Sequence, residues 1–226
     1  MFKIEKNQSN NHKKIKFTPE QLDVLKEIGN IGSGNAITAL SKLIGKKVEM
    51  SLTSLELTPF WKIPIFFDDN DTQVFGILSQ IREKDEFRLM QIYSKESVIS
   101  MINYIYEKNK INHETINLLK DLDNFSLSII QEIGNILAGH YTSSIANLLS
   151  ISIIPDVPNI ALDNIQALTN STIAKYSQKS DLIIFIETKL KIEELELEGF
   201  IFLFAPIKTV KNLLKILDQK FNFESG

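Results

Sequence analysis

Cysteine is absent from the 226 residues of this chain, and histidine occurs only three times. Without cysteine the chain can form no disulfide, no thiolate metal site and no cysteine nucleophile. The histidines at positions 12, 113 and 140 are too scattered to have the spacing of metal ligands. We therefore expect no metal site made by the chain's own residues.

Long apolar segments and an excess of basic residues are missing as well. No stretch approaches the roughly 18 apolar residues of a membrane-spanning helix, and residues 1–17 are too polar for a signal peptide. The 25 basic and 28 acidic residues give a net charge of −3, without the basic excess typical of proteins that bind nucleic-acid phosphates. The expectation is a cytoplasmic protein with no membrane insertion and no nucleic-acid partner.

The composition that remains is that of an ordinary globular protein, with 43% hydrophobic and 23% charged residues. Residues 1–17 are polar and lysine-rich, which predicts a flexible N-terminal tail. No linker rich in glycine or serine divides the rest of the chain. We expect residues 18–226 to form one domain with a mixed α/β (α+β) fold and a continuous sheet.

Local patterns predict where the helices and strands of this domain lie. Thr18 can cap a helix whose first turn accepts Pro19, and Gly45 is placed to end that helix after Ile44. Alternating and β-branched segments predict strands, and longer segments with helical periodicity predict helices. The strands are expected over 48–57, 74–81, 87–93, 182–192 and 200–204, and the other helices over 97–107, 118–149, 162–176 and 207–217.

An internal repeat accompanies this order of elements. The pentapeptide EIGNI occurs at residues 27–31 and again 105 residues later at 132–136, and Gly34 matches Gly139 at the same spacing. The order helix, strands, helix occurs twice as well. This agreement indicates a duplication with repeats of about 18–112 and 113–226.

Each copy of the repeat places a polar stripe on its helix, because steps of three and four residues return to the same face. The stripes consist of Asp23, Glu27, Asn30 and Gly34 in the first copy, and Ser128, Glu132, Asn135 and Gly139 in the second. A second, mostly small or apolar stripe should face the core. Glycine inside a helix costs about 1 kcal/mol relative to alanine, so we expect Gly29 and Gly134 to allow close packing, and Gly34 and Gly139 to leave room for a partner.

A glutamate and an asparagine at this spacing contain no nucleophile, and asparagine cannot act as a base. Asparagine can hold a water molecule through its amide group, and glutamate can pair with a lysine of a partner. Such a pair suits phosphoryl transfer, in which positioning supplies most of the catalysis and the substrate can bring the electrophile and the metal. The glycines at 29, 32 and 34 match neither nucleotide-binding glycine pattern, and no strand precedes them.

The segments LKEIGNIGSGNAITALSKLIGKKVEM and IIQEIGNILAGHYTSSIANLL resemble the two signature helices of the CheC family, within the CheC/CheX/FliY group of chemotaxis phosphatases. The family pattern continues with a proline. Pro158 follows Asn135 by 23 residues and fits this pattern, whereas Thr53 occupies the corresponding position after Asn30. The second copy therefore matches completely, and Thr53 leaves the shape of the first strand open.

The resemblance implies a fold with pseudo-twofold symmetry and two signature helices exposed on one side. It also implies a substrate, phosphorylated CheY, which brings its own aspartyl phosphate and Mg²⁺, so the chain needs no cofactor of its own. Asn30 and Asn135 would orient the attacking water, and Glu27 and Glu132 would contact the regulator's lysine. Members of the family also bind CheD, for which Asp163, at the expected start of the helix over 162–176, is a candidate contact.

Two intact motifs favour a CheC-type monomer over a CheX protein, which has one active motif and dimerises. A FliY protein would carry an additional C-terminal switch domain, so the end of the chain at Gly226 favours CheC. The main alternative is a non-catalytic CheY-binding module related to the flagellar switch middle domain. His140, in the position of Asn35, is either a contact with the regulator or an ordinary helix residue.

Overall fold

The computed structural model describes residues 18–59, 73–81, 87–112, 114–116, 118, 121–149, 155–176, 182–195 and 197–221. The expected N-terminal tail, residues 1–17, lies outside these ranges. The helices are α1 (Pro19–Ile44), α2 (Lys95–Lys108), α3 (Asn124–Leu149), α4 (Ile165–Tyr176) and α5 (Ile207–Phe221), with a short 3₁₀ turn, η3 (Glu193–Leu195). The strands are β1 (Glu49–Pro59), β2 (Gln73–Ile81), β3 (Phe87–Ser94), β4 (Asn159–Asn164), β5 (Leu182–Ile192) and β6 (Leu197–Pro206).

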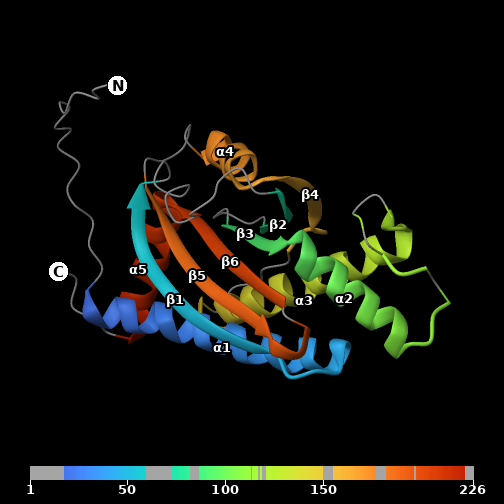
Figure 1. The fold of residues 1–226 in the computed structure, drawn as a ribbon. Helices are drawn as coiled ribbons and strands as arrows, with labels where there is room; N and C mark the ends of the chain where they lie inside the picture. The colour runs from blue at the N-terminus through green and yellow to red at the C-terminus, as the bar shows by residue number, and fades with distance from the viewer. Residues whose placement is uncertain are drawn as a thin grey trace.

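The six strands form one antiparallel sheet in the order β1-β5-β6-β3-β2-β4 (Figure 1). β1 is the first strand of the first half of the chain, and it pairs with a strand of the second half. β4 is the first strand of the second half, and it pairs with a strand of the first half. The order is therefore the same from either edge, which confirms a mixed fold with pseudo-twofold symmetry and a continuous sheet.

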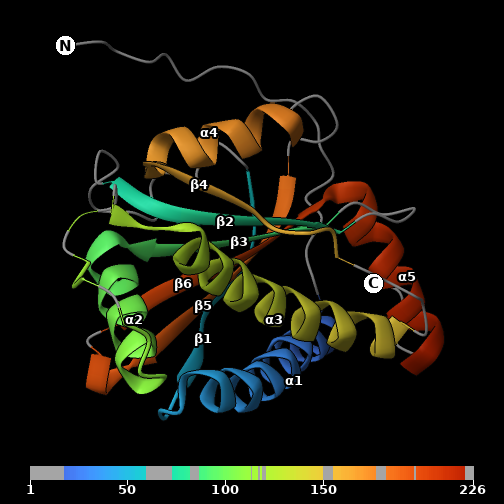
Figure 2. The ribbon, with the colours of Figure 1, turned by 90° about the vertical axis from the view of Figure 1, so that its right-hand side faces the viewer.

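Helices cover both faces of this sheet. Alternate residues of β3 divide between two hydrophobic clusters: Leu89 and Tyr93 belong to the cluster under α1 and α3, and Met90 and Ile92 to the cluster under α4. This is the period-two alternation of a strand that is buried on both faces. Figure 2 shows α1 and α3 together on one side of the sheet and α4 on the other.

The first signature helix, α1, begins and ends as predicted. Thr18 and Gln21 form a reciprocal capping box, in which the Gln21 N–H donates to Thr18 Oγ1 at 3.2 Å. Gly45 ends the helix with a φ of 76°, a left-handed conformation that glycine adopts without strain. Lys108 Nζ donates to the Leu43 and Ile44 carbonyls at 3.2 and 3.0 Å, so α2 holds the C-terminal end of α1 in place.

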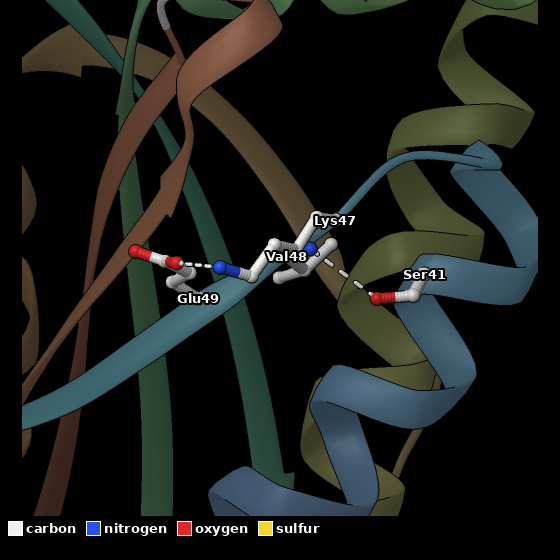
Figure 3. Close-up of polar contacts among 4 residues, drawn as sticks. All are labelled: Ser41, Lys47, Val48 and Glu49. Carbon is white, nitrogen blue, oxygen red and sulfur yellow. Dashed lines mark hydrogen bonds and ion pairs between the residues drawn. The ribbon is translucent and has the colours of Figure 1, made fainter.

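The turn from α1 into β1 is held by short-range contacts, which Figure 3 draws. The Val48 N–H donates to Ser41 Oγ at 3.3 Å, and Lys47 Nζ donates to Glu49 Oε1 at 2.5 Å. The Val48 side chain is buried, whereas Lys47 and Glu49 are exposed. Exposed ion pairs contribute little to stability, so the capped helix end and the buried valine determine how the strand leaves the helix.

The second signature helix begins later than predicted, at Asn124 rather than near residue 118. Asp123 is the reason, because its Oδ1 accepts hydrogen bonds from the Ser126 N–H at 2.7 Å and the Ser126 hydroxyl at 2.8 Å. Tyr106 of α2 donates to the same oxygen at 2.6 Å. An aspartate in this position stabilises the free N–H groups of a first helical turn.

These contacts predict a pH dependence of stability. They lower the pKa of Asp123 from 3.8 to about 2, through the Tyr106 hydroxyl first and then through Ser126. Because the folded pKa is lowered, the stabilisation is present above pH 4 and is lost as pH falls toward 2. Asp123→Asn keeps a capping side chain but cannot ionise. The difference in Tm between parent and variant should therefore shrink from pH 6 to pH 2.5; a constant difference would contradict the assignment.

The segment 159–164 was wrongly predicted to include the start of a helix. Asp163 lies in the edge strand β4, which pairs with β2 in the register Val74↔Asp163. α4 begins at Ile165 because Asn164 Oδ1 accepts the Ala167 N–H at 2.7 Å and caps the helix. Pairing with β2, which is distant in sequence, therefore decides the structure of residues that a local helical pattern misassigns.

Candidate functional site

The two signature helices lie side by side and run in opposite directions, as Figure 1 and Figure 2 both show. They cross closely at Gly32, where a Cβ atom would lie 3.3 Å from Tyr141 Cα. Backbones approach this closely only where one partner has no side chain. Gly32 therefore brings together the two helices that carry the repeated Glu/Asn pairs.

The structure places both polar stripes at the surface. Their exposed members are Asp23, Glu27, Asn30, Gly34, Ser128, Glu132 and Asn135, and Gly139 is half-buried. Within each stripe the residues lie along one side of their helix. Because α1 and α3 pack against each other, the two stripes lie on neighbouring helices. The arrangement is an open surface with two similar sets of groups.

The outer members of the two stripes differ in their own contacts. Asp23 pairs with Lys26 at 3.5 Å, one turn further along α1. Ser128 instead donates to the Phe125 carbonyl at 2.7 Å, within α3. Gln131 takes the place of Lys26 in the second copy, so the two sites differ in charge beside the glutamate.

The glycines of the repeat fall into two groups by what surrounds them. A Cβ atom at Gly134 would lie 2.6 Å from Ile77 Cγ2 of β2, and one at Gly29 would lie 3.6 Å from Leu52 Cδ1 of β1. At Gly34 and Gly139 a Cβ atom would meet nothing within 4 Å. The first group lets each helix pack on a strand, and the second leaves open space one turn beyond each asparagine.

Pro158, which completes the motif in the second copy, is buried beside Gly134 of α3. Its ring would lie 3.4 Å from a Cβ atom at Gly134, and its carbonyl accepts a hydrogen bond from Gln131 Nε2 at 3.3 Å. In the first copy β1 shifts register between Leu52 and Ser54. The irregularity falls at Thr53, so the strand changes shape at the position where the first copy lacks the proline.

A buried polar side chain binds the carbonyl of the repeated glycine in each copy. Ser33 Oγ donates to the Gly29 carbonyl at 2.7 Å and lies 2.9 Å from the Tyr141 hydroxyl, which in turn donates to Thr188 Oγ1 at 2.8 Å. These contacts tie α1, α3 and β5 together beneath the first Glu/Asn pair.

The second copy uses different residues for the same purpose. Gln91 Nε2 donates to the Gly134 carbonyl at 3.1 Å, and the Tyr93 hydroxyl donates to Gln91 Oε1 at 3.0 Å. Burial raises the pKa of both Tyr93 and Tyr141, so both hydroxyls stay protonated near neutral pH. No sequence motif marks these residues, although a glutamine between apolar neighbours in a buried strand is a usable signal.

A metal-binding group or a hollow that includes the two Glu/Asn pairs would add to the chemistry of the site. Among the residues that the structure describes, no group of three or more histidines, aspartates or glutamates could hold a metal ion. Open hollows of about 500 and 540 Å³ lie beside α2 and beside β1, and neither is lined by a glutamate or asparagine of the two pairs. Within the described ranges, no helix is both long and apolar enough to cross a membrane.

The fold and the two signature helices are similar to those of CheC-like proteins. The sequence model of the CheC-like family matches residues 20–51 and 125–162, which contain both Glu/Asn pairs and Pro158. The resemblance to this family that the sequence predicted is confirmed. The match ends at Leu162, so it does not include Asp163, the candidate contact for CheD.

Known relatives agree with this assignment. The chain is 27% identical over 205 residues to the CheY-P phosphatase CheC of Bacillus subtilis (strain 168), covering 88% of this chain and 94% of the relative. The fold is similar to that of Thermotoga maritima FliY, with a TM-score of 0.67, 20% identity and coverage of 91% of this chain and 100% of the other. It is also similar to the FliM middle domain from H. pylori, with a TM-score of 0.64, 10% identity and coverage of 88% and 99%. The match to the Bacillus relative supports a CheC-family role in chemotaxis, and the two structural matches show the fold alone.

Proposed function

We propose that this protein is a phosphatase that hydrolyses the aspartyl phosphate of a phosphorylated CheY-type response regulator. Each of the two signature helices supplies one site. The regulator brings the phosphoryl group and the Mg²⁺ bound beside it, so the metal belongs to the substrate. The chain's own groups then have to position water and the regulator, which is the part of phosphoryl transfer that a protein surface can supply.

In each site the roles divide between the two polar residues. Asn30 and Asn135 orient the water that attacks phosphorus, because an amide both accepts and donates hydrogen bonds and does not titrate. Glu27 and Glu132, one turn away on the same face, dock the regulator by pairing with its lysine. The products are inorganic phosphate and the regulator with a free aspartate.

One observation carries this proposal: both Glu/Asn pairs are exposed on matched helices with open space beside them at Gly34 and Gly139. A surface residue of no function needs neither the repetition nor the clearance. The likeness to a CheY-P phosphatase over most of both chains supports the same assignment.

A second candidate function is a docking module that binds CheY without hydrolysing its phosphate. The fold of a flagellar switch middle domain is similar to this one, and this favours the alternative. Retention of glutamate and asparagine in both copies favours the phosphatase. Binding alone would not need a group that orients water.

The test is to follow the decay of phosphorylated CheY, with Mg²⁺, in the presence and absence of the protein, and to measure binding in parallel. Phosphatase function predicts faster decay in proportion to the protein added. Binding with an unchanged decay rate, also with CheD present, would show that the chain is a docking module.

CheD is part of the proposal as a second partner, and Asp163 is an exposed candidate contact for it. Asp163 lies in the edge strand β4, directly before α4, and α4 covers the face of the sheet opposite the signature helices (Figure 2). CheD bound there would leave the two Glu/Asn sites open. The proposed setting is the cytoplasm, with the protein acting as a monomer.

A further inference from the structure

The separation of the two sites follows from the crossing of the signature helices. Gly32 lies against Tyr141, and the helices run in opposite directions. Asn30, two residues before Gly32, therefore lies opposite Ser143, two residues after Tyr141. Ser143 is eight residues from Asn135 along α3. Eight residues span about 12 Å of helix, and packed helix axes lie about 8 to 10 Å apart. The two asparagines are about 15 Å apart by this geometry.

The same geometry places Gly34 level with Gly139, midway between the two sites. A Cβ atom at either position would meet nothing within 4 Å. Asn35 and His140 follow these glycines, the first exposed and the second half-buried. The surface between the two sites, at Gly34 and Gly139, is therefore open and adjoins both of them.

The surface that a docked regulator covers is wider than the distance between the two asparagines. Specific protein–protein contacts bury about 800 Å² on each partner, a patch roughly 30 Å across, and small transient ones are only slightly narrower. Two such patches centred about 15 Å apart overlap over Gly34 and Gly139. Two regulators would compete for the same surface.

We propose that the two Glu/Asn sites are mutually exclusive, so that one chain holds one phosphorylated regulator at a time. This inference rests on the proposed function. The duplication then provides two equivalent ways to capture one regulator, and it does not double the number that can be processed at once. The maximal rate of the parent protein cannot exceed that of the faster single site.

The first test is the stoichiometry of binding to CheY activated by beryllofluoride, a stable mimic of its phosphoryl group, measured by titration calorimetry. One regulator per chain is expected for the parent. Two regulators per chain would overturn mutual exclusion and leave the phosphatase proposal intact. Absence of binding, together with unchanged decay of phosphorylated CheY, would overturn both.

The second test uses two single-site variants, Glu27→Arg with Asn30→Ala and Glu132→Arg with Asn135→Ala. All four side chains are exposed, so the fold should survive, and thermal unfolding would check this. Each variant should still bind one regulator. At saturating regulator the parent's maximal rate should equal or fall below that of the faster variant. A parent rate equal to the sum of the two variant rates would show independent sites and overturn the inference.

Discussion

Replacing Asn30 and Asn135 together by alanine is expected to abolish the acceleration of CheY dephosphorylation. Both asparagines are exposed on the signature helices, and the surface one turn beyond each of them is open at Gly34 and Gly139. Removing a group that positions a reactant or stabilises a transition state costs about 10² to 10³ in rate. The single variants should each keep part of the activity, because the other site remains. The measurement is the first-order decay of phosphorylated CheY.

The matched control is Asn147→Ala, the same substitution at an exposed position of α3 twelve residues beyond Asn135. This variant should match the parent in rate and in stability. Binding of beryllofluoride-activated CheY should survive in the double variant, because Glu27 and Glu132 remain. A double variant that still accelerates decay like the parent would refute the assigned role of the asparagines.

The substitutions Gly32→Leu and Gly34→Leu are expected to have opposite effects on stability, although the two positions are only two residues apart on α1. A side chain at Gly32 meets the backbone of Tyr141 at 3.3 Å, so the helices must separate, and overpacking of this kind costs about 1 to 3 kcal/mol. A side chain at Gly34 meets nothing within 4 Å and gains the higher helix propensity, which contributes up to about 1 kcal/mol.

The Gly34→Leu variant should lose activity although it does not lose stability. Leucine at position 34 occupies the clearance one turn from Asn30, so the α1 site should lose at least tenfold in rate while the protein unfolds at an equal or higher Tm. The measurement is best made with Asn135→Ala present, so that only the α1 site contributes. Full activity in that background would show that Gly34 provides no clearance for the regulator.

Local signals were sufficient for α1. The capping box of Thr18 and Gln21 and the left-handed Gly45 involve partners within four residues, so the sequence alone specifies both ends of the helix. The start of α3 was placed too early because a helical pattern extends upstream of Asp123. The Tyr106 hydroxyl that secures this cap comes from another helix, and no local pattern reports it.

The candidate site shows the same division. The repeat and the spacing of Glu27 and Asn30 were visible in the sequence because they depend only on helix periodicity. The residues beneath the site were not, because their partners lie in distant segments: Tyr141 contacts the Ser33 hydroxyl of α1, and Gln91 donates to the Gly134 carbonyl of α3. Contacts of this kind exist only once the sheet has formed.

By itself the sequence determined the duplication, the two polar stripes, the ends of α1 and the resemblance of the two repeated helices to those of the CheC family. These features depend on residue type and on spacings of three to four residues, or on direct comparison of the two halves. Only the tertiary structure decided the sheet order, the strand at 159–164, the shift of register at Thr53 and the closeness of the two sites. Each of these depends on which distant segments pack together, and that is set by the burial of shared surfaces and by hydrogen bonds across the sheet.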